Sequence, residues 1–357
     1  MSQMSSAAKP LRLAGAVAVV AGATRGAGRG IARALGEAGA MVYCTGRSVR
    51  GRPSPYNRPE TIEETAESIN AAGGHAFALR VDHTAAAEVA ALFERVEHEQ
   101  GRLDILVNSI AGEDPMMNWW VPFWEVNLTN AEALLRQALV SRVTTAKHAA
   151  RLMTRRQRGF IVEVTENDLL LSSGDALTQF LRFSHKSLAA IYAAEMRKQG
   201  IVAVAITPGF MRSERVLEHF GVTEENWREA GKQDRNFLES ESPLFVGRAI
   251  VALATDPAIA ERSGQLFSSW EVARDYGLAD VDGRRPDWGS LEIDYSQIPL
   301  AMLESMQDAI EVQAAWLELL SKRTRSFQAA FLKQTAALAV AEHLGNRRDG
   351  IPVARGH

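Results

Sequence analysis

The chain has 357 residues, of which 46% are hydrophobic and 23% charged, and its formal net charge at pH 7 is −3. This length suits one large α/β domain with an appendage, or two domains, and the balanced charge with scattered basic residues argues against a nucleic-acid partner. No apolar run approaches the roughly 18 residues of a membrane span, and the N-terminal segment lacks the apolar core of a secretory signal, so we expect no membrane partner.

Strand-like and helix-like segments alternate up to about residue 290. Continuous apolar runs, typical of parallel strands covered on both faces, occur at 16–22, 40–46, 75–82, 103–112, 159–165 and 201–209. Helical patterns occur between them at 29–38, 59–73, 85–101, 131–153 and in a segment that ends near Gly200, and 263–277 could add a short strand and a helix. This alternation predicts a doubly wound parallel sheet, a Rossmann-like α/β fold, over residues 1–290.

The single cysteine, Cys44, falls within the second apolar run. A lone cysteine excludes an internal disulfide and fits a reducing compartment. We therefore expect a cytoplasmic protein in which Cys44 is buried and inert.

The C-terminal segment has a different character. Between residues 300 and 344 there is neither glycine nor proline, and apolar residues recur at helical spacing. We predict a helical hairpin extension over 291–345, whose apolar stripe packs on the main domain or on another subunit, and a disordered tail over 346–357. Packing is favoured over a role as a binding groove.

Three glycines, Gly22, Gly26 and Gly28, separate the first predicted strand from the first predicted helix. A pyrophosphate needs backbone N–H groups close to its oxygens, glycine leaves room for that approach, and a helix N-terminus adds partial positive charge. The strand–loop–helix context favours a dinucleotide site, with Thr24 and Arg25 in its loop, over a tight turn without a ligand.

The end of the second predicted strand indicates which dinucleotide is bound. An NAD site usually offers an acidic side chain there, whereas this chain has Arg47 and Ser48 and no acid. Arg25 in the glycine loop is a second cation within reach. Because two cations favour a doubly ionised 2′-phosphate, we predict NADP(H) rather than NAD(H); the alternative is that Arg47 is only a solvated residue.

These motifs resemble those of the short-chain dehydrogenase/reductase family. The glycine pattern is similar to the family signature, with Ala21 in place of the usual threonine, and "RVDHT", "LVNSIAG" and "ITPGFMRSE" resemble its adenine, Asn-Asn-Ala-Gly and Pro-Gly segments. The resemblance covers about residues 13–288, and in its details the chain resembles the dehydrogenase/reductase member-1-like subgroup. The resemblance implies a homodimer or homotetramer. It also implies that the cofactor is bound by Asp82, His83, Asn108, Ala111, Gly112, Pro208 and Gly209.

The family's ketone chemistry uses a tyrosine, a lysine four residues on, a serine and a helix asparagine. Counting back from the Pro-Gly turn without gaps puts Thr178 at the tyrosine and Arg182 at the lysine, with Thr165 thirteen residues before Thr178, the family's spacing. A second register puts Arg182 at the tyrosine and Lys186 at the lysine, but requires a deletion later in the helix. Neither supplies a tyrosine, so we predict that Thr165, Thr178 and Arg182 orient or polarise the substrate.

Other residues are weaker candidates for the missing groups. Tyr192 lies on the same predicted helix but roughly 15–21 Å further along it, so packing is favoured. Asn127 mimics the family asparagine, but counting back from "ARLM" places that position at Ala138, so Asn127 is expected before the helix and the proton relay is predicted to be missing. The titratable residues nearby in the sequence are Glu166, Asp168, His185 and Lys186.

Of these four, His185 has the most suitable unperturbed pKa, although a solvated or structural histidine is favoured. No cluster of histidine, cysteine and acidic residues has metal-ligand spacing, so no metal site is predicted. Three functions remain open. An NADP(H)-dependent oxidoreductase acting on a carbonyl or imine-like small molecule is favoured over a catalytically silent or repurposed dinucleotide-binding protein, and over an enzyme of non-redox chemistry.

Overall fold

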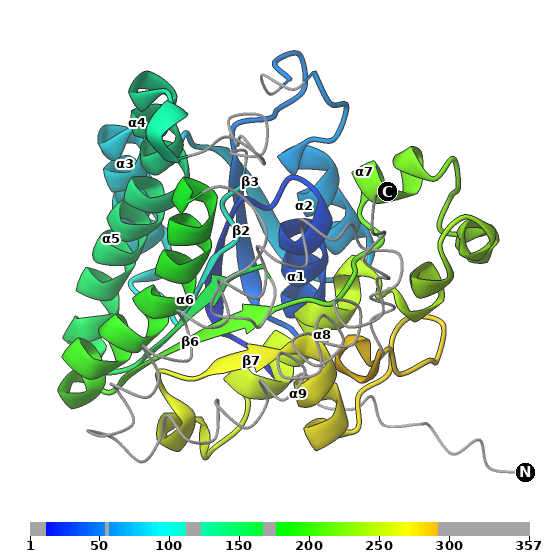
Figure 1. The fold of residues 1–357 in the computed structure, drawn as a ribbon. Helices are drawn as coiled ribbons and strands as arrows, with labels where there is room; N and C mark the ends of the chain where they lie inside the picture. The colour runs from blue at the N-terminus through cyan, green and yellow to red at the C-terminus, as the bar shows by residue number, and fades with distance from the viewer. Residues whose placement is uncertain (1–11, 54–56, 112–122, 167–175, 292–357) are drawn as a thin grey trace, which may run out of the picture.

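The structure is a computed structural model, and it describes residues 12–53, 57–111, 123–166 and 176–291. Within these ranges, seven parallel strands form one sheet in the order β3-β2-β1-β4-β5-β6-β7 (Figure 1). The strands are β1 (Val17–Ala21), β2 (Met41–Gly46), β3 (His75–Arg80), β4 (Ile105–Asn108), β5 (Gly159–Val164), β6 (Ile201–Thr207) and β7 (Leu266–Ser268). The predicted doubly wound, Rossmann-like sheet is confirmed.

Helices cover both faces of the sheet (Figure 1). On one face lie α1 (Gly26–Glu37), α2 (Ile62–Ala71), α8 (Pro243–Ala254) and α9 (Ser269–Tyr276). On the other lie α3 (Ala86–Gln100), α5 (Ser141–Arg156) and α6 (Ala176–Met196), while α4 (Leu128–Leu135) precedes α5 and α7 (Glu214–His219) follows β6. One short π-helix, η3 (Arg136–Val140), joins α4 to α5. The short 3-10 helices are η2 (Phe123–Glu125), η4 (Arg197–Gln199), η5 (Trp227–Lys232), η6 (Arg235–Glu239), η7 (Ile259–Arg262) and η8 (Trp288–Ser290).

The burial of β1 explains its continuous apolar sequence. Val17 and Val19 pack in the apolar cluster that holds α3 and α5, and Ala18 and Val20 pack in the cluster that holds α1 and α8. Successive side chains of a strand point to opposite faces, so a strand covered on both faces has no polar position.

Three helical features differ from the predictions. Helix α1 begins at Gly26 rather than at Arg29, and the segment predicted at 131–153 is a helical run over 128–156 that includes η3. Helices α7 and α8 were not predicted. Helix α8 packs so closely on α1 that a Cβ atom at Gly30 would lie 1.9 Å from the carbonyl oxygen of Pro243.

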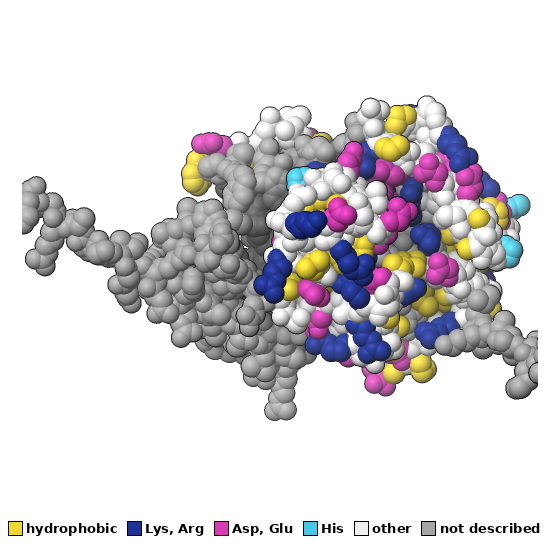
Figure 2. All heavy atoms as spheres, turned by 90° about the vertical axis from the view of Figure 1, so that its right-hand side faces the viewer, with side chains coloured by type: hydrophobic (Ala, Val, Ile, Leu, Met, Phe, Trp, Pro, Cys, Tyr) yellow, Lys and Arg dark blue, Asp and Glu magenta, His cyan; other side chains and the backbone are white. Residues whose placement is uncertain are grey.

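The predicted C-terminal hairpin, apart from Leu291, and the predicted tail lie outside the described residues. In the described ranges no helix is both long and apolar enough to cross a bilayer. Cys44 is buried, which raises the pKa of its thiol to about 12. Figure 2 shows the side of the molecule at the right of Figure 1, where basic and acidic side chains are interspersed among the described residues.

Candidate functional site

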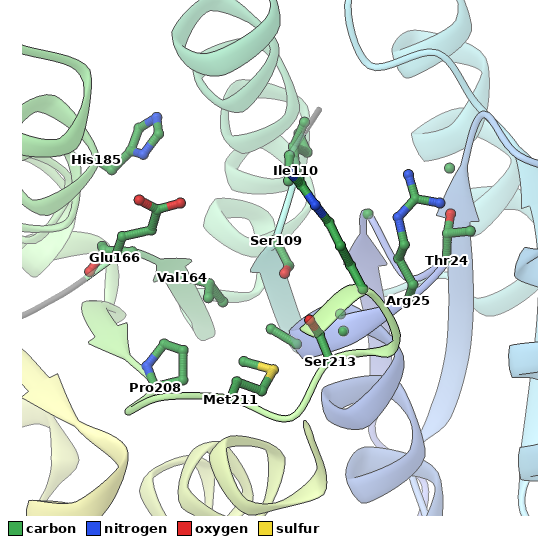
Figure 3. A pocket seen from close by; sticks show the side chains of 18 of the residues that line it. Thr24, Arg25, Ser109, Ile110, Val164, Glu166, His185, Pro208, Met211 and Ser213 are labelled. Carbon is green, nitrogen blue, oxygen red and sulfur yellow. The ribbon is translucent and has the colours of Figure 1, made fainter. Parts of the chain in front are cut away.

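A cavity of about 700 Å³ opens where the strand order reverses, at the carboxyl ends of β1, β4 and β5. This crevice is the usual ligand position in an open α/β sheet. Its walls are the glycine loop, the segment after β2, the ends of β4 and β5, helix α6 and residues 208–216. In Figure 3, Thr24 and Arg25 lie on one side of the cavity, and Glu166 and His185 lie on the other.

The glycine loop joins β1 to α1 and lines the cavity. Gly22 has a φ of +90°, and a Cβ atom there would lie 2.2 Å from the carbonyl oxygen of Ser109, so only glycine lets the loop lie against the end of β4. The N-cap of α1, Arg25, makes no capping hydrogen bond with its side chain. Instead, the N–H of Gly26 donates to Oε2 of Glu214 at 2.8 Å, so a carboxylate already lies at this helix N-terminus.

Three arginines line the cavity near the end of β2. Arg47 is half-buried and forms no ion pair or hydrogen bond within the described part of the chain. Arg25 pairs with Glu60 at 3.4 Å, and Arg58 pairs with Glu60 at 2.6 Å and with Glu218 at 2.5 Å. Arg25 and Arg47, which were predicted to bind the cofactor, thus both line the cavity. Arg58 also lines it, and the sequence analysis missed this residue because it lies in the loop after the strand.

The segment after β3 contributes Asp82 and His83 to the wall. His83 is buried between Thr45 and Thr145, and each ring nitrogen lies 2.9 Å from a threonine hydroxyl. Burial, followed by the nearby charge of Arg47, lowers the pKa of His83 to about 4 against the opposing effect of Asp82. His83 is therefore neutral, and both of its nitrogens are engaged in holding β2 to α5. Thr24 and Ser48 also line the cavity.

The residues at and after the end of β4 that were predicted to contact the cofactor lie in different places. Ala111 lines the cavity, but Asn108 is fully buried behind the wall, where its Nδ2 donates to Glu163 at 2.7 Å. This buried carboxylate draws the amide away from the cavity. Gly112 lies outside the described residues.

Beside Asn108 lies a buried ion pair that the sequence analysis missed. Nη1 of Arg142 lies 3.1 Å from Glu163, and the guanidinium also donates to the carbonyl oxygens of Asn108, Ile110 and Val164. Burial raises the pKa of Glu163, although Arg142 and Asn108 oppose that shift. Arg142 therefore ties the ends of β4 and β5 together at the cavity floor.

The predicted catalytic residues are only partly brought together. Thr165 and Arg182 both line the cavity, and the buried hydroxyl of Thr165 has no hydrogen-bond partner in the described residues. Arg182 donates from Nε and Nη2 to Glu166 at 2.7 and 2.6 Å. Thr178 is fully buried on α6 and is not among the lining residues, so its catalytic role stays a prediction.

His185 lines the cavity one turn beyond Arg182. Its Nε2 lies 2.8 Å from the carbonyl oxygen of Ala138, which can only accept, so this nitrogen carries the proton. Burial, together with the charge of Arg142, lowers the pKa of His185 well below its usual value, despite that hydrogen bond. The neutral ring therefore leaves Nδ1 as an acceptor, and His185 is not a solvated histidine.

Tyr192 is a packing residue, as predicted, because its ring packs in the cluster between the sheet and α5 and it does not line the cavity. Asn127 precedes the helix, as predicted, and its side chain caps α4. Lys186 is buried on α6 and Asp168 lies outside the described residues. Among the described residues that line the cavity there is neither a tyrosine nor a lysine.

Pro208 and Gly209 also line the cavity, followed by Phe210 and Met211. The turn is held from beneath by Glu241, whose Oε2 accepts a hydrogen bond from the N–H of Gly209 at 3.0 Å. Sequence reasoning missed Glu241, because it lies 32 residues away in the chain and belongs to no motif.

Comparison with known proteins agrees with this geometry. Residues 22–260 match the family model described as Enoyl-(Acyl carrier protein) reductase. The chain is 37% identical over 290 residues to dehydrogenase/reductase SDR family member 1 of Mus musculus, covering 80% of this chain and 89% of that protein. It is 35% identical over 274 residues to the Homo sapiens protein of the same name, covering 76% and 84%.

The fold is also similar to solved structures. One is a putative NAD(P)-dependent gluconate 5-dehydrogenase from Beutenbergia cavernae with NADP bound at low occupancy. That chain is 25% identical and superimposes with a TM-score of 0.58, covering 73% of this chain and 97% of that one. The glycine loop, the sheet and these similarities lead to one conclusion: the chain belongs to the short-chain dehydrogenase/reductase family of oxidoreductases.

Proposed function

We propose that this oxidoreductase uses NADP(H) and acts on a carbonyl or imine-like group of a small molecule. The observation that carries the proposal is a single cavity with a helix N-terminus and Arg47 at one end and Thr165 and Arg182 at the other. This arrangement can hold an anionic cofactor while leaving polar groups for a substrate.

The residues of the cavity fit a phosphorylated nicotinamide dinucleotide. The backbone at Gly26 and Gly28 would hold the pyrophosphate, and Arg47 would bind the 2′-phosphate, with Arg25 and Arg58 beside it. Arg47 is the best placed of the three cations, because the other two already share Glu60. When bound, the cofactor supplies a hydride.

The residues at the reacting end suit polarisation better than proton donation. The hydroxyl of Thr165 can donate a hydrogen bond to a substrate oxygen. Arg182 is paired with Glu166; it can still donate hydrogen bonds, but a guanidinium does not release its proton. His185 is neutral and offers only the Nδ1 lone pair. An iminium group accepts a hydride without a proton, which favours an imine-like substrate over a simple ketone.

The second candidate is a protein that binds the dinucleotide without turning it over, favoured by the absence of tyrosine and lysine from the described cavity lining. The two are separated by titrating the full chain with NADPH and then following NADPH oxidation with ketones, cyclic imines and enones. We expect binding, and turnover of imines above that of ketones. Replacement of Arg182 by methionine should lower turnover without abolishing NADPH binding. Tight binding with no oxidation across the panel would favour the second candidate.

We further propose a cytoplasmic homodimer or homotetramer. The proposal is supported by three large apolar side chains that are exposed on α6, namely Phe180, Phe183 and Ile191. Mass photometry of the full chain should show a dimer or tetramer, and a monomer at micromolar concentration would contradict this.

A further inference from the structure

Glu241 lies directly beneath the turn formed by residues 208–211. It follows η6, and its side chain is buried, with the whole residue only 1% exposed. Its Oε2 accepts hydrogen bonds from the N–H of Gly209 at 3.0 Å and from the hydroxyl of Ser269 at 2.5 Å. One carboxyl oxygen thus joins the turn at the cavity to the N-terminus of α9.

The main chain of Glu241 holds the same turn. Its N–H donates to the carbonyl oxygen of Phe210 at 2.9 Å, and its carbonyl oxygen accepts from the N–H of Arg212 at 2.8 Å. These two bonds form a parallel bridge across Met211. Since Gly209, Phe210 and Met211 all line the cavity, one residue outside the cavity fixes the backbone of one wall.

The approach of Glu241 to the turn is close. A Cβ atom built on Gly209 would lie 2.9 Å from Cβ of Trp288 and 3.1 Å from Oε2 of Glu241. The turn is therefore confined between a tryptophan and a carboxyl group, and a displacement of the carboxyl group would shift the cavity wall.

The charge around Glu241 is unfavourable for an ionised carboxylate. The charged groups that face it are the buried carboxylate of Asp280 and the guanidinium of Arg212, which pairs with Glu224 at 2.9 Å and with Asp280 at 3.5 Å. Glu241 has no ion-pair partner of its own in the described residues, and its Oε1 is buried without a hydrogen-bond partner there.

These surroundings keep a proton on the carboxyl group at neutral pH. Burial raises the pKa of Glu241 to about 8; Asp280 adds to the increase, and the hydrogen bonds from Ser269 and Gly209 and the charge of Arg212 oppose it. A neutral carboxyl group can still accept both hydrogen bonds at Oε2, from Gly209 and from Ser269. An anion would lie buried beside Asp280, which costs free energy that movement of the turn can relieve.

We propose that Glu241 is a positioning residue for the cavity, and that its protonated carboxyl group fixes the 208–211 turn in the place that ligand binding requires. Loss of that proton loosens the turn and weakens binding of the nicotinamide half of the cofactor. The inference rests on the proposed function, because the turn affects a ligand only if the cavity holds one.

The test compares the full-length wild type with Glu241→Gln and Glu241→Ala, using Glu239→Gln as the matched control. Glu239 is a nearby carboxylate that forms no hydrogen bond or ion pair with its side chain in the described residues. NADPH dissociation constants are measured by fluorescence between about pH 6.5 and pH 9.5. We expect the wild type and Glu239→Gln to lose about tenfold in affinity over the upper part of that range.

Glutamine imitates the neutral carboxyl group, so Glu241→Gln should bind NADPH as the wild type does at neutral pH and keep that affinity at high pH. Glu241→Ala should bind about tenfold more weakly at every pH, as expected for the loss of a buried hydrogen bond and its packing. Equal pH dependence in the wild type and Glu241→Gln would overturn the inference, and this comparison remains valid if Glu241→Ala fails to fold.

A second readout needs no cofactor. Hydrogen–deuterium exchange of the peptide that contains residues 208–212, corrected for the intrinsic effect of pH, should rise above about pH 8 in the wild type but not in Glu241→Gln. If the wild type binds no NADPH but the exchange behaves in this way, the proposed function fails and the positioning role stands. If NADPH binds but exchange is the same in both proteins, the positioning role fails alone.

Discussion

The carboxylate of Glu214 accepts a hydrogen bond from the N–H of Gly26, with 2.8 Å between Oε2 and N, although the two residues lie 188 positions apart. Its Oε1 lies 3.5 Å from Arg29. A carboxylate from α7 therefore caps the helix whose N-terminus would face the cofactor pyrophosphate. The carboxylate of Glu214 therefore lies next to the position that the cofactor pyrophosphate, a second anion, would occupy.

Glu214→Gln should therefore bind NADPH more tightly than the wild type. Removal of one negative charge near a helix N-terminus is worth about 0.3–1 kcal/mol here, or roughly twofold to fivefold in the dissociation constant. The measurement is a fluorescence titration at low ionic strength, with Glu229→Gln, an exposed carboxylate of η5, as the control. Weaker binding by Glu214→Gln would show that Glu214 supports the cofactor instead.

Arg47 should decide between the two nicotinamide dinucleotides. Since it has no ion-pair partner in the described residues, a 2′-phosphate would be its counter-ion. Arg47→Ala should weaken NADPH binding by roughly tenfold to a hundredfold, the usual worth of a hydrogen bond to a charged group, and leave NADH binding nearly unchanged. An equal loss for both dinucleotides, measured by calorimetry, would remove Arg47 from the 2′-phosphate site.

The buried pair of Arg142 and Glu163 should matter strongly for stability. Glu163→Leu leaves the guanidinium without its counter-ion, and we expect a loss of about 3–5 kcal/mol in the free energy of unfolding. Arg142→Met combined with Glu163→Leu should recover part of that loss, because both charges are then gone. Urea unfolding measures both, with Arg95→Ala at an exposed pair as the control, expected to cost less than about 1 kcal/mol. Additive losses would contradict a coupled pair.

A tyrosine at position 178 should not create a ketoreductase. Thr178 is fully buried and does not line the cavity, so the larger ring must displace packed neighbours at a cost of about 1–3 kcal/mol. Thr178→Tyr, alone or with Arg182→Lys, should have a lower unfolding temperature and no new ketone reduction. A gain of ketone reduction would place residue 178 at the reacting group, as the gapless register implies.

The sequence predicts the parts of the molecule that depend on local patterns. Six of the seven strands were predicted from apolar runs, which are continuous in strands covered on both faces such as β1, and the seventh was predicted only as a possible short strand. The glycine loop was recognised because three glycines separate an apolar run from a helical pattern, and the structure shows that Gly22 has a positive φ and lies close to β4. Arg25, Arg47, Thr165 and Arg182 were placed at the cavity because each follows a strand or lies at a fixed distance from a motif.

The remaining features depend on contacts between distant segments. Glu214 meets Gly26 over 188 positions, and Glu241, which lies outside the cavity, meets Gly209 over 32 positions. Both contacts arise only through tertiary packing. Asn108 fits the family motif, yet Glu163 draws it behind the wall. Side-chain direction at such positions is set by the partner charge, which sequence spacing does not reveal.

The most direct test of the central claim is a crystal structure of the full chain with NADPH. The pyrophosphate should lie against the loop that contains Gly26 and Gly28, the 2′-phosphate should contact Arg47, and the nicotinamide should lie between Thr165 and Pro208. An empty cavity at saturating NADPH, or a dinucleotide bound elsewhere on the molecule, would contradict the claim.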